Sequence, residues 1–243
     1  MDTATKSIAR RLRLLTLSLM PLLLFGGAFA LLSCSSEKEK PKELTPDQVQ
    51  GTLIRELIMM AEQEQRDREM LDSIINEKGW RSPEGQAIAS RSAENDSTNM
   101  ARLEQIISQY GWPGKSLVGD QASMAAFLVL QHADLPRQEK YLPMVQAAAE
   151  KGDVEKSYLA MLQDRVLMRQ NKPQKYGTQL WNDPSTGELG LYTIEDSVNV
   201  DQRRAEMGLP PIADYLRNMG INPDSLGQRD STNIIINLGD STK

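Results

Sequence analysis

The sequence of 243 residues contains only one cysteine and one histidine, and this scarcity limits the chemistry open to the protein. A single cysteine excludes an intramolecular disulfide, and a single histidine disfavours a zinc or copper site built from the usual His and Cys ligands. The sequence also lacks a calcium-loop pattern, a glycine-rich nucleotide-binding loop and the G-x-S-x-G motif of many hydrolases. We therefore expect neither a metal ion nor a cofactor.

Aromatic residues are also few, at 5%, whereas the chain has 12 methionines, 40% hydrophobic residues and 25% charged residues. This composition is typical of a globular protein with an aliphatic and Met-rich core, and it favours helices. The first 33 residues have four basic side chains and one acidic one, so removing their charge of +3 changes the net charge from -5 to -8. An acidic surface repels phosphate backbones, and we predict no nucleic-acid partner.

The N-terminal segment has the order of a bacterial export signal. A basic stretch, Lys6–Arg13, precedes an apolar run from Leu14 to Leu32, and Leu31-Leu32-Ser33-Cys34 follows at its end. This tetrapeptide resembles the lipobox of bacterial lipoproteins, which implies attachment of lipid, palmitate included, to the Cys34 thiol and cleavage before it. The alternative is an uncleaved transmembrane anchor, because the apolar run is nearly long enough to span a bilayer.

Both interpretations place the rest of the chain outside the cytoplasm, in the cell envelope, with the membrane as a partner. Ser35 rather than Asp follows Cys34, and this resembles the sorting signal that directs Gram-negative lipoproteins to the outer membrane. We divide the chain into a signal peptide at 1–33, a polar tether at 34–44, a helical domain at 45–219 and a polar, disordered tail at 220–243.

The expected fold is mainly α: an irregular multi-helix bundle with one small β-hairpin. Thr45-Pro46-Asp47-Gln48 has the pattern of a capped helix start, and Gly79 provides a stop. Helical periodicity and stop signals predict helices over about 45–79, 84–93, 96–110, 121–134, 137–151, 154–169, 200–207 and 211–219. Pro143 is expected to displace the start of its helix or to kink it. Residues 176–181 and 189–193 flank a turn-rich loop and predict the hairpin.

The stretch Gln131-His132-Ala133-Asp134 is the first candidate for chemistry, because it lies at the exit of a helix that is apolar all round. His132 has the properties of a general base oriented by a carboxylate such as Asp134. The structural alternative is that His132 binds free carbonyl groups at the helix end while Asp134 caps the next helix. Gln131 is a further candidate for ligand binding.

Three other stretches combine polar groups in a similar way. Asp164-Arg165 interrupts an apolar helix and predicts either a buried ion-pair network or a guanidinium presented to an anionic ligand. Gln174, Tyr176, Thr178 and Gln179 surround a glycine, in a pattern that suits either a polar ligand or a tight turn. Arg203-Arg204 is expected to pair with the acidic surface, with substrate contact as the alternative.

Together these motifs resemble a family of bacterial domains of unknown function. The resemblance rests on Gly111-Trp112-Pro113, Val118-Gly119, Gln131-His132-Ala133-Asp134, Asp164-Arg165, Pro173-Gln174, Tyr176-Gly177-Thr178-Gln179, Arg203-Arg204 and Gly208-Leu209, and it covers about residues 50–217. It implies one coherent domain, and it implies no activity, ligand or catalytic residue.

The leading functional hypothesis is a lipid-anchored envelope protein that binds a small polar molecule, a peptide or an envelope protein. Its pocket is expected to be lined by His132, Asp134, Arg165, Tyr176 and Gln179. An alternative is a hydrolase-like envelope enzyme with His132 as general base and Arg165 as electrostatic stabiliser, so the sequence leaves open whether the protein is an enzyme. A structural interaction module is the third hypothesis.

Overall fold

The computed structural model describes residues 45–182 and 189–223, and within these ranges the protein is mainly helical. The helices and strands occur in this order: α2 (Pro46–Lys78), α3 (Pro83–Tyr110), α4 (Lys115–His132), α5 (Leu135–Glu150), α6 (Lys156–Arg169), β1 (Leu180–Asn182), β2 (Leu189–Leu191), α7 (Val200–Glu206) and α8 (Ile212–Asn218). The predicted mainly-α fold with one small β-hairpin is thus confirmed. The signal peptide, the tether and the tail after residue 223 lie outside the described residues.

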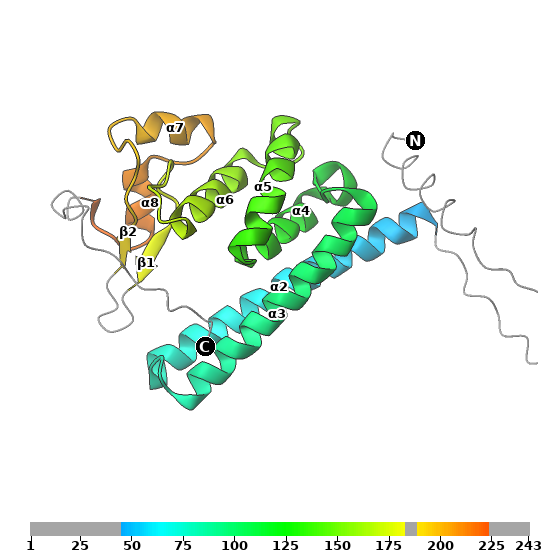
Figure 1. The fold of residues 1–243 in the computed structure, drawn as a ribbon, viewed down its shortest axis with the longest axis horizontal. Coiled ribbons are helices and arrows are strands. Elements are labelled where there is room, and N and C mark those ends of the chain that lie inside the picture. The colour runs from blue at the N-terminus through cyan, green and yellow to red at the C-terminus, as the bar shows by residue number, and fades with distance from the viewer. Residues whose placement is uncertain (1–44, 183–188, 224–243) are drawn as a thin grey trace, which may run out of the picture.

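The two longest helices, α2 and α3, form an antiparallel hairpin along one side of the molecule (Figure 1). The predicted start of α2 is confirmed, because Thr45 and Gln48 form the reciprocal hydrogen bonds of a capping box, 3.3 Å and 3.0 Å long. Gly79, with φ of +84°, ends the helix. Ser82 then caps α3 by accepting a hydrogen bond from the backbone of Gly85.

The α3 helix is continuous from Pro83 to Tyr110, so the expectation of two separate helices, 84–93 and 96–110, is wrong. Asn95 and Asp96 lie where the break was expected, and both residue types favour helix ends. In the structure both side chains bind α2: Asn95 donates to Asp67, and Asp96 accepts from Arg68. These tertiary contacts outweigh the weak local preference.

The hydrophobic core lies where α4 packs against the α2–α3 hairpin. Leu57, Leu103 and Leu130 represent these three helices in the core, and all are fully buried. The α4 helix is kinked at Gly119, whose φ of +77° lies in the region that side chains other than glycine rarely adopt. Trp112 is buried in the core.

The α5 and α6 helices connect this core to the β-hairpin and to α7 and α8. Asp134 caps α5, and Pro143 lies inside the helix without displacing its start. In the hairpin Trp181 pairs with Gly190, where a Cβ atom would lie 2.2 Å from the indole ring. Ile221 is buried after α8, so the packed body extends slightly beyond the predicted boundary at residue 219. No helix in the described ranges has the length and apolar character needed to cross a membrane.

Candidate functional site

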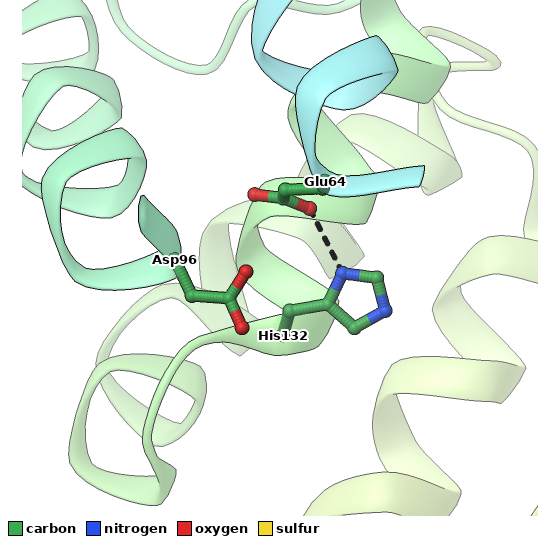
Figure 2. A group of neighbouring side chains, drawn as sticks. All are labelled: Glu64, Asp96 and His132. Atoms are coloured by element: carbon green, nitrogen blue, oxygen red, sulfur yellow. Dashed lines mark hydrogen bonds and ion pairs between the residues drawn. The ribbon is translucent and has the colours of Figure 1, made fainter. Parts of the chain in front are cut away.

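His132 is the last residue of α4 and binds a buried carboxylate of α2. Its Nδ1 atom lies 2.9 Å from Oε2 of Glu64, a residue that is only 2% exposed (Figure 2). The other oxygen of Glu64, Oε1, accepts a hydrogen bond of 3.2 Å from Asn99 of α3. Three helices therefore converge on one carboxylate.

Asp96 of α3 adds a second carboxylate to this cluster, and Figure 2 shows its side chain directed toward the Glu64–His132 pair. One ligand atom from each of the three residues lies within 4.8 Å of the other two. Both oxygens of Asp96 also accept from Nη2 of Arg68, at 3.2 Å and 3.0 Å. Burial raises the pKa of Asp96, and the charge of Glu64 adds to this effect, although Arg68 opposes it.

Two carboxylates and one imidazole at this spacing form a donor set that suits a divalent cation. This donor set could not be predicted from the sequence, because the three residues come from three distant segments. A cation here would have to displace Arg68 from Asp96 and the imidazole of His132 from Glu64. Metal binding therefore competes with contacts that the cluster already makes.

The same geometry suits proton transfer. With Glu64 ionised, Nδ1 of His132 carries the hydrogen and its N–H group donates a hydrogen bond to the carboxylate, which leaves Nε2 as the acceptor. Among the described residues, Nε2 has no hydrogen-bond partner, and the His132 side chain is 22% exposed. An imidazole oriented by a buried carboxylate is the arrangement that general bases use.

The carboxylate that orients His132 is Glu64, whereas the sequence suggested Asp134. Asp134 instead caps α5: it accepts from the backbone N–H of Arg137 at 3.1 Å and from the guanidinium of the same residue at 2.9 Å. Gln131 is buried, and its backbone carbonyl accepts from the side chain of Gln138. Its side-chain Oε1 has no partner within the described part of the chain.

Arg165 on α6 is half-buried and lies one helical turn before Arg169, which binds the residue after His132. Its Nε atom is buried without a hydrogen-bond partner, and no ion pair involves its guanidinium within the described ranges. Burial lowers the pKa of Arg165 to about 10, and the positive charges of Arg169 and Arg68 act in the same direction. Arg169 itself donates to the carbonyl of Ala133, directly after His132.

Asp164, the residue before Arg165, organises a loop instead of pairing with the guanidinium. Its fully buried carboxylate accepts from the backbone N–H groups of Lys175, Tyr176 and Thr178 and from the Thr178 hydroxyl, at 2.7–3.2 Å. Burial raises its pKa, and these hydrogen bonds oppose the rise. The first half of the predicted Asp164-Arg165 pair therefore has a structural role.

Gln174 and Gln179 extend this loop network and are both buried. The side chain of Gln174 donates to the carbonyls of Gln179 and Tyr192 and accepts from the backbone of Gln179. The side chain of Gln179 donates to the carbonyl of Met161 and to the Thr178 hydroxyl. Their amides are thus used to fix the loop.

The two arginines of α7 bind the same loop. Arg203 contacts Asp196, through Nη1 at 3.2 Å, and the carbonyl of Lys175. Arg204 is 1% exposed and donates to the carbonyls of Pro210 and Tyr176. The expected pairing with acidic groups therefore describes Arg203, while Arg204 serves as a buried donor to backbone.

The predicted site residues thus fall into three groups. His132 and Arg165 lie at the junction of α2, α3, α4 and α6, and Gln131 and Asp134 bind residues of α5. The remaining candidates build the loop network: Asp164, Gln174, Tyr176, Thr178, Gln179 and Arg203. Glu64, Asp96 and Arg68 were not predicted. The signal for Glu64 and Arg68 is the polar stretch 63–69 in the middle of α2, where an amphipathic helix would have buried apolar residues. Asp96 has no comparable local signal.

Comparison with known proteins yields a match to a family model. Neither a curated protein nor a solved structure matches the chain. A model described as a family of unknown function (DUF6624) matches residues 51–227, which include Glu64, Asp96, His132 and Arg165. This chain therefore belongs to the DUF6624 family of unknown function.

Proposed function

We propose that this protein is a lipid-anchored component of the bacterial cell envelope whose helical domain binds a small polar ligand at His132. The observation that carries the ligand-binding proposal is the Glu64–His132 pair. The pair fixes the orientation of an imidazole that keeps one nitrogen unused among the described residues and is partly accessible to solvent. Binding sites characteristically place a few fixed polar groups in this way.

Alternative uses of His132 explain less. A histidine at a helix C-terminus commonly stabilises free carbonyls, yet the carbonyl of Ala133 accepts from Arg169, and His132 is bonded to α2. Glu64 is almost completely buried, and its carboxylate needs a hydrogen-bond donor. A neutral amide side chain would supply that donor, so a purely structural role does not require a histidine. A titratable, oriented and partly exposed ring is better suited to contact with a ligand.

A ligand screen with the full chain in detergent tests this proposal. The probes are small polar metabolites, both neutral and charged, and the readouts are thermal shift and calorimetry. His132→Gln keeps an amide donor for Glu64, so we expect it to fold and to bind a hit about tenfold more weakly, the loss of one hydrogen bond to a polar partner. Lys156→Gln, at an exposed position of α6, is the matched control and should bind as wild type does.

Equal affinity of wild type and His132→Gln for every hit would show that His132 does not contact the ligand. If His132→Gln is destabilised but the folded fraction binds every hit as wild type does, His132 has a structural role instead.

The proposed membrane anchor is the lipid on Cys34. Its support is the order of basic residues, apolar run and Leu-Leu-Ser-Cys in the sequence. Two or more acyl chains give stable attachment without contacts between the domain and the bilayer. Ser35 supports the outer membrane of a Gram-negative bacterium as the address. The N-terminal residue and mass of protein isolated from the envelope test this assignment.

A second candidate function is hydrolysis, and the Glu64–His132 hydrogen bond specifically favours it. In this mechanism Nε2 of His132 accepts a proton from water as the water oxygen attacks an ester or amide carbonyl to form a tetrahedral intermediate, and Glu64 stabilises the imidazolium. The imidazolium then returns the proton to the departing alkoxide or amine as the C–O or C–N bond breaks, which leaves a carboxylic acid and a neutral imidazole. A screen of hydrolytic substrates should then show turnover that His132→Gln abolishes. Turnover that persists in this variant would eliminate the mechanism.

A further inference from the structure

Among the described residues, Arg165 has no acidic partner, although its guanidinium is half-buried. Asp164 precedes it in sequence, but successive residues of a helix point in different directions, and the Asp164 carboxylate is bound by the loop at 175–178. Within the described residues no carboxylate pairs with Arg165, and its buried Nε atom makes no hydrogen bond. Removing a charged group from water without a partner is costly, so an unpaired group of this kind calls for an explanation.

The surroundings of Arg165 connect it to the His132 cluster on two sides. Arg169 lies one helical turn further along α6 and binds the carbonyl that follows His132. Arg68 of α2 binds Asp96, its positive charge contributes to the lowered pKa of Arg165, and its own Nε atom is buried without a partner among the described residues. Arg165 is therefore connected to the His132 cluster through Arg169, one turn away on α6, and is coupled electrostatically to Arg68.

The charges at this junction do not balance. Three guanidiniums, those of Arg68, Arg165 and Arg169, meet two carboxylates, those of Glu64 and Asp96. The nearby Asp134 adds no net negative charge, because it already pairs with Arg137. The described residues thus leave one positive charge uncompensated with His132 neutral, and two with His132 protonated.

We infer that Arg165, with Arg68 and Arg169, binds an oxyanion of the ligand, a phosphoryl or a carboxylate group, beside His132. This inference rests on the proposed ligand-binding function and names its ligand class. Arg is suited to the task because its planar fork binds two oxygens of such a group at once. The junction also disfavours a metal ion binding alone, since a divalent cation would add to an existing excess of positive charge.

Calorimetry on the full chain in detergent tests the inference with three probes: inorganic phosphate, succinate and glycerol 3-phosphate. Sodium chloride of matched ionic strength controls for screening of surface charge. We expect at least one probe to bind wild type and to bind Arg165→Gln about tenfold more weakly, with Arg165→Lys between them because it retains the charge without the fork. Arg217→Gln removes an exposed arginine of α8 and should bind as wild type does.

The probes also separate the possible sources of the anion. Tighter binding of glycerol 3-phosphate than of phosphate supports a lipid headgroup, and equal binding supports a free anion. If no probe binds, or if Arg165→Gln binds every probe as wild type does, the inference is overturned. Should a neutral ligand nevertheless bind in a His132-dependent way, the proposed function stands and only the ligand class is wrong.

Discussion

Asp164 illustrates how a polar residue that resembles a ligand contact can be committed to structure. Its two oxygens satisfy three backbone N–H groups of one loop, groups that would otherwise be buried without acceptors. The loop in turn holds the side chains of Gln174 and Gln179. One carboxylate thus organises the segment between α6 and the β-hairpin.

We predict that Asp164→Asn lowers the free energy of unfolding by about 2–4 kcal/mol. The substitution keeps the shape but turns an NH2 group toward the donors that the lost oxygen accepted from. Urea denaturation followed by circular dichroism measures the change. Asp214 forms an exposed ion pair with Arg217, and Asp214→Asn is the control: it should change the free energy of unfolding by less than about 0.5 kcal/mol. An Asp164→Asn variant as stable as this control would contradict the structural role.

At the residue scale, the sequence identified some of the residues at the site but not the residues that they contact. It singled out His132 and Arg165, both of which lie at the junction, because a lone histidine and a charged residue in an apolar stretch stand out locally. It could not identify Glu64 or Asp96, because each is one of many acidic residues on a polar helix face. Only the packing of α2, α3 and α4 distinguishes them.

Among the elements, the α2–α3 hairpin has buried polar contacts between its two helices in addition to apolar ones. Asp67 of α2 is 1% exposed and accepts from Gln63 at 3.0 Å, Arg91 at 2.7 Å and Asn95 at 2.6 Å. Burial disfavours its ionised form, but the hydrogen bonds from Asn95, Gln63 and Arg91 outweigh this effect, so the pKa of Asp67 is lowered.

This lowered pKa predicts how the hairpin responds to acid. Because Asp67 is more acidic in the folded than in the unfolded protein, its contribution is fully present above the unfolded pKa of about 4. The contribution is lost as the pH falls through the lower folded value. The free energy of unfolding of wild type should therefore decrease more between pH 5 and pH 3 than that of Asp67→Asn.

Urea denaturation at the two pH values measures this difference. Asp72→Asn, at an exposed position of α2, is the control and should follow the wild-type profile. Parallel pH profiles for wild type and Asp67→Asn would show that the hydrogen bonds do not depress the pKa.

Local sequence signals predicted the elements well where a helix end is chemically marked. Thr45, Ser82 and Asp134 are all helix caps in the structure, and Gly79 and Gly111 end their helices. The break that was predicted inside α3 was wrong, since the partners of Asn95 and Asp96 lie on another helix. Such partners lie about 28 residues away and are invisible to a local pattern.

The whole molecule combines a helical body with an N-terminal segment whose role is a proposal. We predict that protein isolated from a bacterial envelope begins at Cys34 and carries fatty acyl groups on it. Peptide and intact-mass spectrometry measure both features, and Cys34→Ser should abolish the acyl mass and leave the first 33 residues attached. A wild-type protein that retains those residues and lacks acyl groups would support the uncleaved anchor instead.

Since α2 is a continuous helix, it also fixes the distance between the candidate site and the first residue of the helix. Glu64 follows Pro46 by eighteen residues, and at about 1.5 Å per residue the cluster lies about 27 Å along the helix axis from Pro46. Under the proposed anchoring, the length of the segment before Thr45 limits the distance between the bilayer and the start of α2. A longer or shorter segment would change the distance that the site can reach from the bilayer, and it would leave the arrangement of Glu64, Asp96 and His132 unaltered.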